Sequence, residues 1–210
     1  MIGEHHKLDP LLFKDMMIKS EKSIEVEKEN INAINVFPIP DGDTGSNMFF
    51  TLRAIVNEVK EVTEITGDSI FQAISKGSFI GAKGNSGVIY SQFLIGVVEF
   101  LEKAENITPK IFSEALIEGT EFAYDSVLNP TEGTILTVMK EVTEKAKEIV
   151  QSNPDISWIE YMETLVEIAF DCLERTKEML DVLKEANVVD AGAKGFALIL
   201  ESWKDIILAK

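Results

Sequence analysis

Apolar residues recur at spacings of three and four along almost the whole chain, and few segments alternate apolar with polar residues. Such spacing places apolar side chains on one face of an α-helix, whereas a half-buried strand needs strict alternation. After the sequence DGDTG, for example, Met48, Leu52, Ile55 and Val59 fall on one helical stripe. The spacing predicts an all-α protein whose helices bury their apolar faces against one another.

Prolines mark two of the expected helix starts. Asp9 and Thr108 each precede a proline, an arrangement typical of an N-cap followed by the first helical residue. We therefore expect helices over residues 10–29 and 108–127. Elsewhere Asp68 is expected to cap a short helix, and one long pattern runs from about residue 157 to residue 184.

About eight helices follow from these signals, and their connections are short. Consecutive helices joined by short connections become neighbours, which favours an antiparallel barrel or bundle. The length of 210 residues and a hydrophobic content of 45% are typical of one globular unit, so we expect a single domain over residues 1–210. Trp158 and Trp203 lie on apolar helical faces and are expected in its core.

Composition excludes several classes of partner and setting. A formal net charge of −16 disfavours nucleic acid and anionic lipid surfaces. No segment reaches the roughly 18 apolar residues of a membrane span, and Cys172 has no second cysteine to pair with. A cytoplasmic protein is expected. His5 and His6 are interpreted as a mobile terminal pair, because nothing nearby orients them.

Four loops carry the functional signal, and each stands directly before an expected helix. Their sequences are PDGDTGSNM, GAKGNSG, NPTEGT and VDAGAKG. Helix starts offer unpaired N–H groups and the positive end of the helix dipole, which suits phosphate oxygens. Four such helix starts facing one point would hold a polyphosphate.

The first loop adds two acids to this chemistry. Asp41 and Asp43 repel phosphate directly, but paired carboxylates suit Mg²⁺, which commonly joins one or two acids to substrate phosphates. The residues expected to contact the phosphates are Thr44, Gly45, Ser46 and Asn47 from this loop, Gly84, Asn85 and Ser86 from the second, Gly133 and Thr134 from the third, and Asp190 and Gly192 from the fourth.

Other interpretations of these loops remain open on local grounds. Each loop by itself also fits a turn that ends in a helix cap, and GAKGNSG also fits a hinge between packed helices. A calcium-binding EF-hand loop is disfavoured, because Gly45, Ser46 and Leu52 occupy the fifth, sixth and twelfth positions. The glycine patterns match neither a P-loop nor a Rossmann fingerprint. A plain helical scaffold is therefore the alternative to a magnesium nucleotide site.

The four motifs together resemble the nucleotide-binding domain of bacterial fatty acid kinase, in the same order and at similar spacing. That domain is similar to the ADP-binding L subunit of dihydroxyacetone kinase, called the DhaL type. The resemblance covers nearly the whole chain and implies a barrel of eight antiparallel helices with ATP or ADP and two Mg²⁺ ions at one end. It also implies a kinase.

The resemblance implies residue roles as well. Asp41 and Asp43 look like the catalytic magnesium ligands, with Asn35 as a third ligand. In the dihydroxyacetone kinase relatives an aspartate precedes the DGD pair by five residues. Here Val36 occupies that position, and Asn35 instead matches the fatty acid kinase pattern.

Two kinase activities follow from this resemblance. In fatty acid kinase the acceptor is an acyl carboxylate presented by a separate fatty-acid-binding carrier protein, the product is an acyl phosphate, and further domains normally follow. In the dihydroxyacetone kinase type the domain works with other kinase subunits and holds ADP as a phosphoryl carrier. A carboxylate is ionised at neutral pH and requires no strong general base, which favours the first activity. A homodimer is compatible with both.

Overall fold

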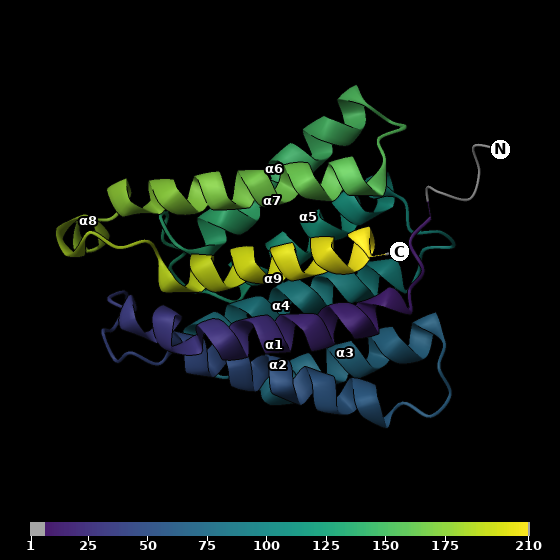
Figure 1. The fold of residues 1–210 in the computed structure, drawn as a ribbon, viewed down its shortest axis with the longest axis horizontal. Coiled ribbons are helices and arrows are strands. Elements are labelled where there is room, and N and C mark those ends of the chain that lie inside the picture. Colours follow the sequence, from purple (N-terminus) through teal and green to yellow (C-terminus); the bar gives the residue numbers. More distant parts are fainter. Residues whose placement is uncertain (1–6, 210) are drawn as a thin grey trace.

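The computed structural model describes residues 7–209, and within that range the chain forms nine α-helices and no strand. The helices are α1 (Leu12–Ala33), α2 (Thr44–Glu61), α3 (Gly67–Gly81), α4 (Gly84–Leu101), α5 (Pro109–Asp125), α6 (Ile135–Ser152), α7 (Trp158–Arg175), α8 (Asp181–Ala186) and α9 (Ala191–Leu208) (Figure 1). A short 3-10 helix, η1 (Thr176–Glu178), precedes α8. The expected all-α class is confirmed, while His5 and His6 lie outside the described residues.

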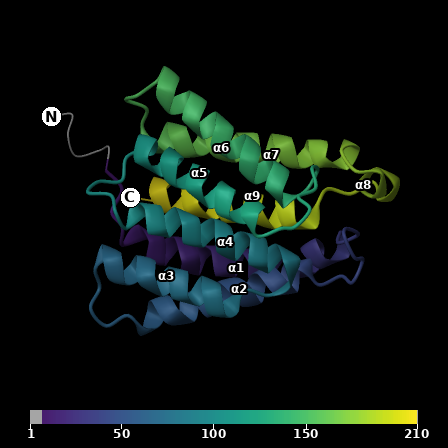
Figure 2. The same ribbon diagram turned by 180° about the vertical axis from the view of Figure 1, so that it is seen from behind.

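Eight of these helices form a closed ring. Each helix packs against the next from α1 to α7, and α9 packs against both α7 and α1. Figure 1 shows α1 beside α9, and Figure 2 shows α4 and α5 on the opposite side. The short helix α8 lies at one end, next to η1. The expected barrel of about eight antiparallel helices is therefore confirmed.

Aromatic side chains fill the core at one end of this barrel. Phe112 on α5 is fully buried, and its ring centroid lies 5.6 Å from that of Trp158 and 6.2 Å from that of Trp203. Phe13 and Tyr161 complete the cluster, with centroids 6.3 and 6.4 Å from that of Phe112. Both tryptophans are buried as expected, and the cluster joins α1, α5, α7 and α9.

Two of the expected helix starts differ from those observed. The first helix begins at Leu12, because the Asp9 carboxylate accepts from the Leu11 N–H at 2.9 Å and forms a turn before the helix. The third helix is capped by Thr66 and not by Asp68. The Thr66 hydroxyl accepts from the N–H of Ser69 at 3.1 Å, and the Ser69 hydroxyl accepts from the N–H of Thr66 at 2.9 Å. Reciprocal capping of this kind satisfies two donors at once.

The expected long helix over residues 157–184 is interrupted. Helix α7 ends at Arg175, and the backbone continues as η1 before it becomes extended at Leu180. The buried Thr176 hydroxyl donates to the Leu173 carbonyl at 2.6 Å and accepts from the N–H of Asp190 at 3.1 Å. This hydroxyl therefore ties the end of α7 to the start of α9, a tertiary contact that apolar periodicity does not contain.

Other expectations are met by the described residues. The Thr108 hydroxyl accepts from the N–H of Ile111 at 3.3 Å, and α5 begins at Pro109. Cys172 is buried, and burial raises the pKa of its thiol to about 12, so it is not a nucleophile at neutral pH. Within residues 7–209 no helix combines the length and apolar content that crossing a bilayer requires.

Candidate functional site

The alternating directions of the helices bring four helix starts to the same end of the barrel. These are the starts of α2, α4, α6 and α9 (Figure 1). The aromatic cluster lies at the other end of the helices. A methyl group added at Gly192 of α9 would lie 3.1 Å from the Ser86 hydroxyl of α4 and 3.3 Å from Cβ of Ile135 of α6. One added at Gly84 of α4 would overlap the side-chain amide of Asn47 on α2. The four loops therefore meet, as the sequence predicted.

The first loop, residues 34–43, is held by a buried amide at its beginning. Asn35 is 5% exposed, and its Nδ2 donates to the carbonyls of Phe37 and Ile39, each at 3.3 Å. Its Oδ1 accepts from the N–H groups of Asp43 at 3.1 Å and Thr44 at 3.3 Å. All four contacts are made within the loop and the start of α2.

A second amide, which the sequence did not single out, holds the next turn. Asn32 lies in the last turn of α1, and its Oδ1 accepts from the N–H of Ser46 at 3.1 Å. Its Nδ2 donates to the Ser46 hydroxyl, also at 3.1 Å. The expectation that free N–H groups at this helix start would bind phosphate needs correction, because the N–H groups of Asp43, Thr44 and Ser46 already have partners.

The two acids of this loop have uncommitted carboxylates. Asp43 is the N-cap residue of α2, yet its side chain makes no capping hydrogen bond. Asp41 is exposed, and among residues 7–209 neither carboxylate has a hydrogen bond or an ion pair. Both line a polar pocket of about 160 Å³. Its walls are Asn35, Pro38, Ile39, Asp41, Asp43, Thr44, Asn47, Gly84, Asn85 and Ser86.

The donor set of this pocket fits a magnesium ion better than a metal held entirely by protein. The described residues contain no cluster of three or more His, Cys, Asp or Glu side chains. Mg²⁺ commonly takes one or two carboxylates and completes its octahedron with water and phosphate oxygens. Asp41 and Asp43 provide such a pair, and the side-chain amides of Asn47 and Asn85 line the same pocket.

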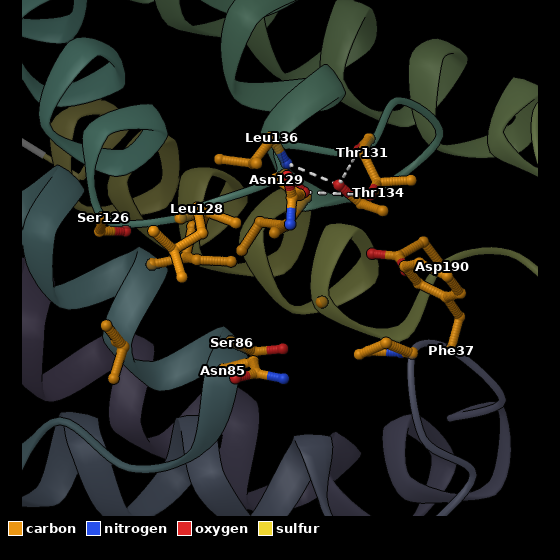
Figure 3. A pocket seen from close by; sticks show the side chains of 16 residues that line it. Phe37, Asn85, Ser86, Ser126, Leu128, Asn129, Thr131, Thr134, Leu136 and Asp190 are labelled. Carbon is orange, nitrogen blue, oxygen red and sulfur yellow. Dashed lines mark hydrogen bonds between the residues drawn. The ribbon is translucent and has the colours of Figure 1, made fainter.

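A larger pocket of about 440 Å³ adjoins the polar one, and the two share Pro38, Asn85 and Ser86. Its wall is mainly apolar and includes Phe37, Val88, Ile89, Val127, Leu128, Ile135 and Leu136. Figure 3 shows Asn85 and Ser86 on one side of this space and Thr134 across it. Two adjoining pockets, one polar and one mainly apolar, suit a ligand with a charged end and a flat apolar end.

Thr134 and Asp190 hold the starts of α6 and α9 at the wall of the larger pocket. The Thr134 hydroxyl donates to the Thr131 carbonyl at 2.8 Å and accepts from the N–H of Leu136 at 3.4 Å (Figure 3). The buried Asp190 carboxylate accepts from the N–H of Ala193 at 2.8 Å. Burial raises the pKa of Asp190 to about 6, because the charged form loses its water.

Most residues singled out in the sequence line one of the two pockets, but three do not. Gly45 packs against α1, where an added methyl group would overlap the Lys28 carbonyl. Gly133 has φ +87°, and an added methyl group there would lie 2.7 Å from Cβ of Met179. Ser46 contacts Asn32. The apolar wall, including Phe37 and Leu128, was missed because loops distant in sequence build it.

Comparison with known proteins identifies relatives along most of the chain. The DAK2 domain family matches residues 38–205. Protein YloV of Bacillus subtilis (strain 168) is 38% identical over 196 residues, which make up 93% of this chain and 35% of YloV. An uncharacterized protein of Staphylococcus aureus (strain bovine RF122 / ET3-1) is 38% identical over 197 residues, 94% of this chain and 36% of that protein. The chain thus spans about a third of these relatives.

A solved structure shares the fold. The dihydroxyacetone kinase from C. freundii, crystallised in complex with AMP-PNP and Mg²⁺, superposes with a TM-score of 0.63 at 17% sequence identity. The superposition covers 96% of this chain and 35% of the kinase chain. Because the family match extends over most of the helical barrel and includes the glycine-rich motifs of all four loops, the chain belongs to the DAK2 domain family.

Proposed function

We propose that this chain forms a single domain that binds a magnesium nucleotide and serves as the ATP-binding part of a kinase. The observation that carries the proposal is the adjoining pair of pockets at one end of the barrel. One pocket is polar and contains two uncommitted carboxylates, and the other has a largely apolar wall that suits an adenine ring. A nucleotide lying across both would place its phosphates beside Asp41 and Asp43.

The residues of the polar pocket divide into metal ligands and phosphate donors. Asp41 and Asp43 would hold magnesium, and we propose that two ions are bound together with ATP. Magnesium, when bound, neutralises charge on the phosphate oxygens. Ser86 and Asn85 would donate from the start of α4, where the helix dipole also favours an anion. Asn35 as a third ligand stays a prediction.

The donors also explain how this chain would orient a phosphoryl group. Short hydroxyl and amide side chains on packed helix starts have few rotamers to lose, so they hold phosphate oxygens in one geometry. Gly84 lets the backbone of α4 approach Asn47 closely, because any side chain there would overlap the amide. The same close approach keeps the two halves of the pocket together.

The acceptor that we favour is a fatty acid carboxylate, which would give an acyl phosphate. The described lining of the polar pocket contains no histidine or lysine, and its two acids are the proposed metal ligands. An ionised carboxylate can attack without a general base, whereas a hydroxyl of dihydroxyacetone would want one nearby. In this proposal a separate fatty-acid-binding protein presents the acceptor, as the motif resemblance implies.

Thermal unfolding with ADP and ATP, with and without Mg²⁺, tests the nucleotide site. Ligand at about 100 times its dissociation constant stabilises the native state by roughly 2.7 kcal/mol, which raises Tm by about 5 to 10 °C in a domain of this size. We expect this shift to require Mg²⁺ and to disappear in Asp41→Ala/Asp43→Ala. Asp155→Ala, an exposed acid at the other end of the barrel, is the control.

Denaturing extraction of the purified protein must accompany this titration. Protein that releases no nucleotide and shows no shift would rule out the proposal and leave the loops as turns between helices. Protein that releases bound ADP and turns over only with a second subunit would support the phosphoryl-carrier activity of the dihydroxyacetone kinase type instead of the fatty acid kinase type.

A further inference from the structure

The start of α2 is capped by side chains from the end of α1 and from the loop that follows it, and not by its own N-cap residue. A helix start leaves four N–H groups without intrahelical partners, and an aspartate at the N-cap usually accepts from one of them. Asp43 occupies this position in α2 but makes no such bond. The four groups belong to Asp43, Thr44, Gly45 and Ser46. Three of them are satisfied, two by Asn35 in the loop after α1 and one by Asn32 in the last turn of α1.

The side-chain amide of Asn35 can adopt only one orientation in this setting. Its Oδ1 faces two N–H donors, those of Asp43 and Thr44, and its Nδ2 faces two carbonyl acceptors. A flipped amide would set donor against donor and acceptor against acceptor. Both lone pairs of Oδ1 are used, so a metal ion at that oxygen would have to displace a backbone N–H.

The orientation of the Asn32 side-chain amide follows from the same donor and acceptor argument. The N–H of Ser46 can only donate, so the atom of Asn32 that faces it is Oδ1, and Nδ2 must face the Ser46 hydroxyl. The Ser46 oxygen therefore accepts from Asn32, so one side chain of α1 holds both the backbone N–H and the hydroxyl of Ser46.

We propose that Asn32 and Asn35, the asparagine pair, are positioning residues that cap α2 in place of Asp43. By taking over the cap they leave the Asp43 carboxylate, next to that of Asp41, free for a cation, while Asn32 fixes the turn at Ser46. The role of these carboxylates rests on the proposed nucleotide function, but the capping itself does not. Asn35 then acts through the loop and not as a metal ligand.

The charges at the site give a reason why amides cap α2 while the carboxylates are left for a cation. A carboxylate that accepts N–H hydrogen bonds is partly neutralised, which weakens it as a ligand for a hard cation. A neutral amide can cap the helix without adding a third negative charge beside Asp41 and Asp43. An amide also supplies two donors for the carbonyls of Phe37 and Ile39, which a carboxylate lacks.

Amide hydrogen exchange on the ligand-free protein tests the capping. Asn35→Ala should speed exchange of the Asp43 and Thr44 N–H groups by about tenfold or more, because their acceptor is removed. Asn30→Ala is the matched control, since Asn30 lies near the end of α1, is exposed, and its side chain bonds only to Glu27. Unchanged exchange at Asp43 and Thr44 would overturn the proposal whether or not a nucleotide binds.

Titration with Mn²⁺ as the probe, followed by electron paramagnetic resonance, separates positioning from ligation. Asn35→Asp keeps an oxygen for a metal but loses both donors to the loop carbonyls, so positioning predicts Mn²⁺ binding about tenfold weaker. A third ligand predicts binding as tight as in the wild type or tighter. Asn30→Asp corrects for the added charge, and tighter binding by Asn35→Asp beyond that control would overturn the proposal.

Amide exchange also tests the role of Asn32. Asn32→Ala removes the acceptor of the Ser46 N–H and should speed its exchange by about tenfold relative to Asn30→Ala. Unchanged exchange at Ser46 would show that Asn32 does not cap α2. Wild-type protein that binds no nucleotide would instead contradict the proposed function, and the exchange results would still decide the capping.

Discussion

Two glycines with positive φ, one between the two acids of the polar pocket and one in its wall, differ in what surrounds them. Gly42 has φ +67° and Gly84 has φ +64°, a region that costs an L-residue about 1 to 2 kcal/mol. A methyl group at Gly42 would meet nothing closer than the Asn32 carbonyl at 3.8 Å, whereas one at Gly84 would overlap the Asn47 amide. An alanine at position 42 would therefore cost backbone strain alone, whereas an alanine at position 84 would also displace Asn47.

This difference gives a matched pair of variants. Gly42→Ala should lower the free energy of unfolding by about 1 kcal/mol, and Gly84→Ala by roughly 2 to 3 kcal/mol, because overpacking adds to the strain. Urea unfolding of both variants measures the difference. Equal losses would show that α4 can move away from Asn47 at little cost and that the close approach is not needed.

Asp190 should make stability depend on pH. Burial raises its pKa to about 6 in the folded protein, from an ordinary value of 3.8, so the folded state holds this proton more tightly than the unfolded state. The contribution of this group to stability is therefore greatest below about pH 4 and decreases as pH rises to about 6. Relative to Asp190→Asn, the wild type should lose on the order of 2 kcal/mol across that window.

Urea unfolding at pH 4 and at pH 7 measures this effect in both proteins. The asparagine retains an oxygen for the Ala193 N–H, so the cap of α9 is preserved while the ionisation is removed. The same substitution at exposed Asp155 is the control. A constant difference between wild type and Asp190→Asn at the two pH values would contradict the raised pKa.

The sequence predicted the acids of the polar pocket but not the amides that hold them. Asp41 and Asp43 stand in a local pattern of glycines and acids that indicates a cation site. Asn32 contacts Ser46, fourteen positions away, through a geometry that exists only when α1 and α2 lie side by side. The one hint in the sequence is that two asparagines three residues apart, Asn32 and Asn35, lie near the end of the first helix.

At the scale of elements, the start of α3 shows which local signals decide a boundary. The sequence favoured Asp68 as the cap, but Thr66 has the extended backbone and the reciprocal bonds with Ser69. Thr66→Ala should lower the free energy of unfolding by about 1 kcal/mol, whereas Asp68→Ala should cost about 0.5 kcal/mol or less through the helix dipole. Thermal or urea unfolding of both variants distinguishes the two residues, and the reverse order would restore Asp68 as the cap.

Boundaries set by local chemistry were predicted well, and boundaries set by tertiary contacts were not. Thr108 and the following proline gave the start of α5 correctly, because the cap and the fixed φ of proline act within one turn. The break after Arg175 depends on the Thr176 hydroxyl, which bonds across to Asp190. Apolar spacing continues through this region, so periodicity alone predicted one long helix.

At the scale of the whole molecule, the aromatic core cluster and the two pockets lie at opposite ends of the barrel. The helices alternate in direction, so the four pocket-forming helix starts lie at one end (Figures 1 and 2). The aromatic cluster lies at the other end. Phe112 is at the centre of that cluster and is fully buried, whereas Leu128 is 98% exposed at the rim of the larger pocket. Changes at the two residues should therefore have opposite consequences.

Phe112→Leu should lower the free energy of unfolding by about 2 kcal/mol, because it removes the ring contacts with four other aromatic residues and leaves a small cavity. Its Kd for ADP in Mg²⁺ should stay within about twofold of the wild type, because the substituted ring lies at the far end of the barrel.

Leu128→Ala should leave the free energy of unfolding within about 0.5 kcal/mol of the wild type, since an exposed side chain buries almost nothing on folding. It should weaken ADP binding by about threefold. Urea unfolding and calorimetric titration on the same two preparations measure all four quantities. A loss of affinity in Phe112→Leu would mean that packing at one end adjusts the pocket at the other, and the two ends would then have to be treated as one cooperative unit.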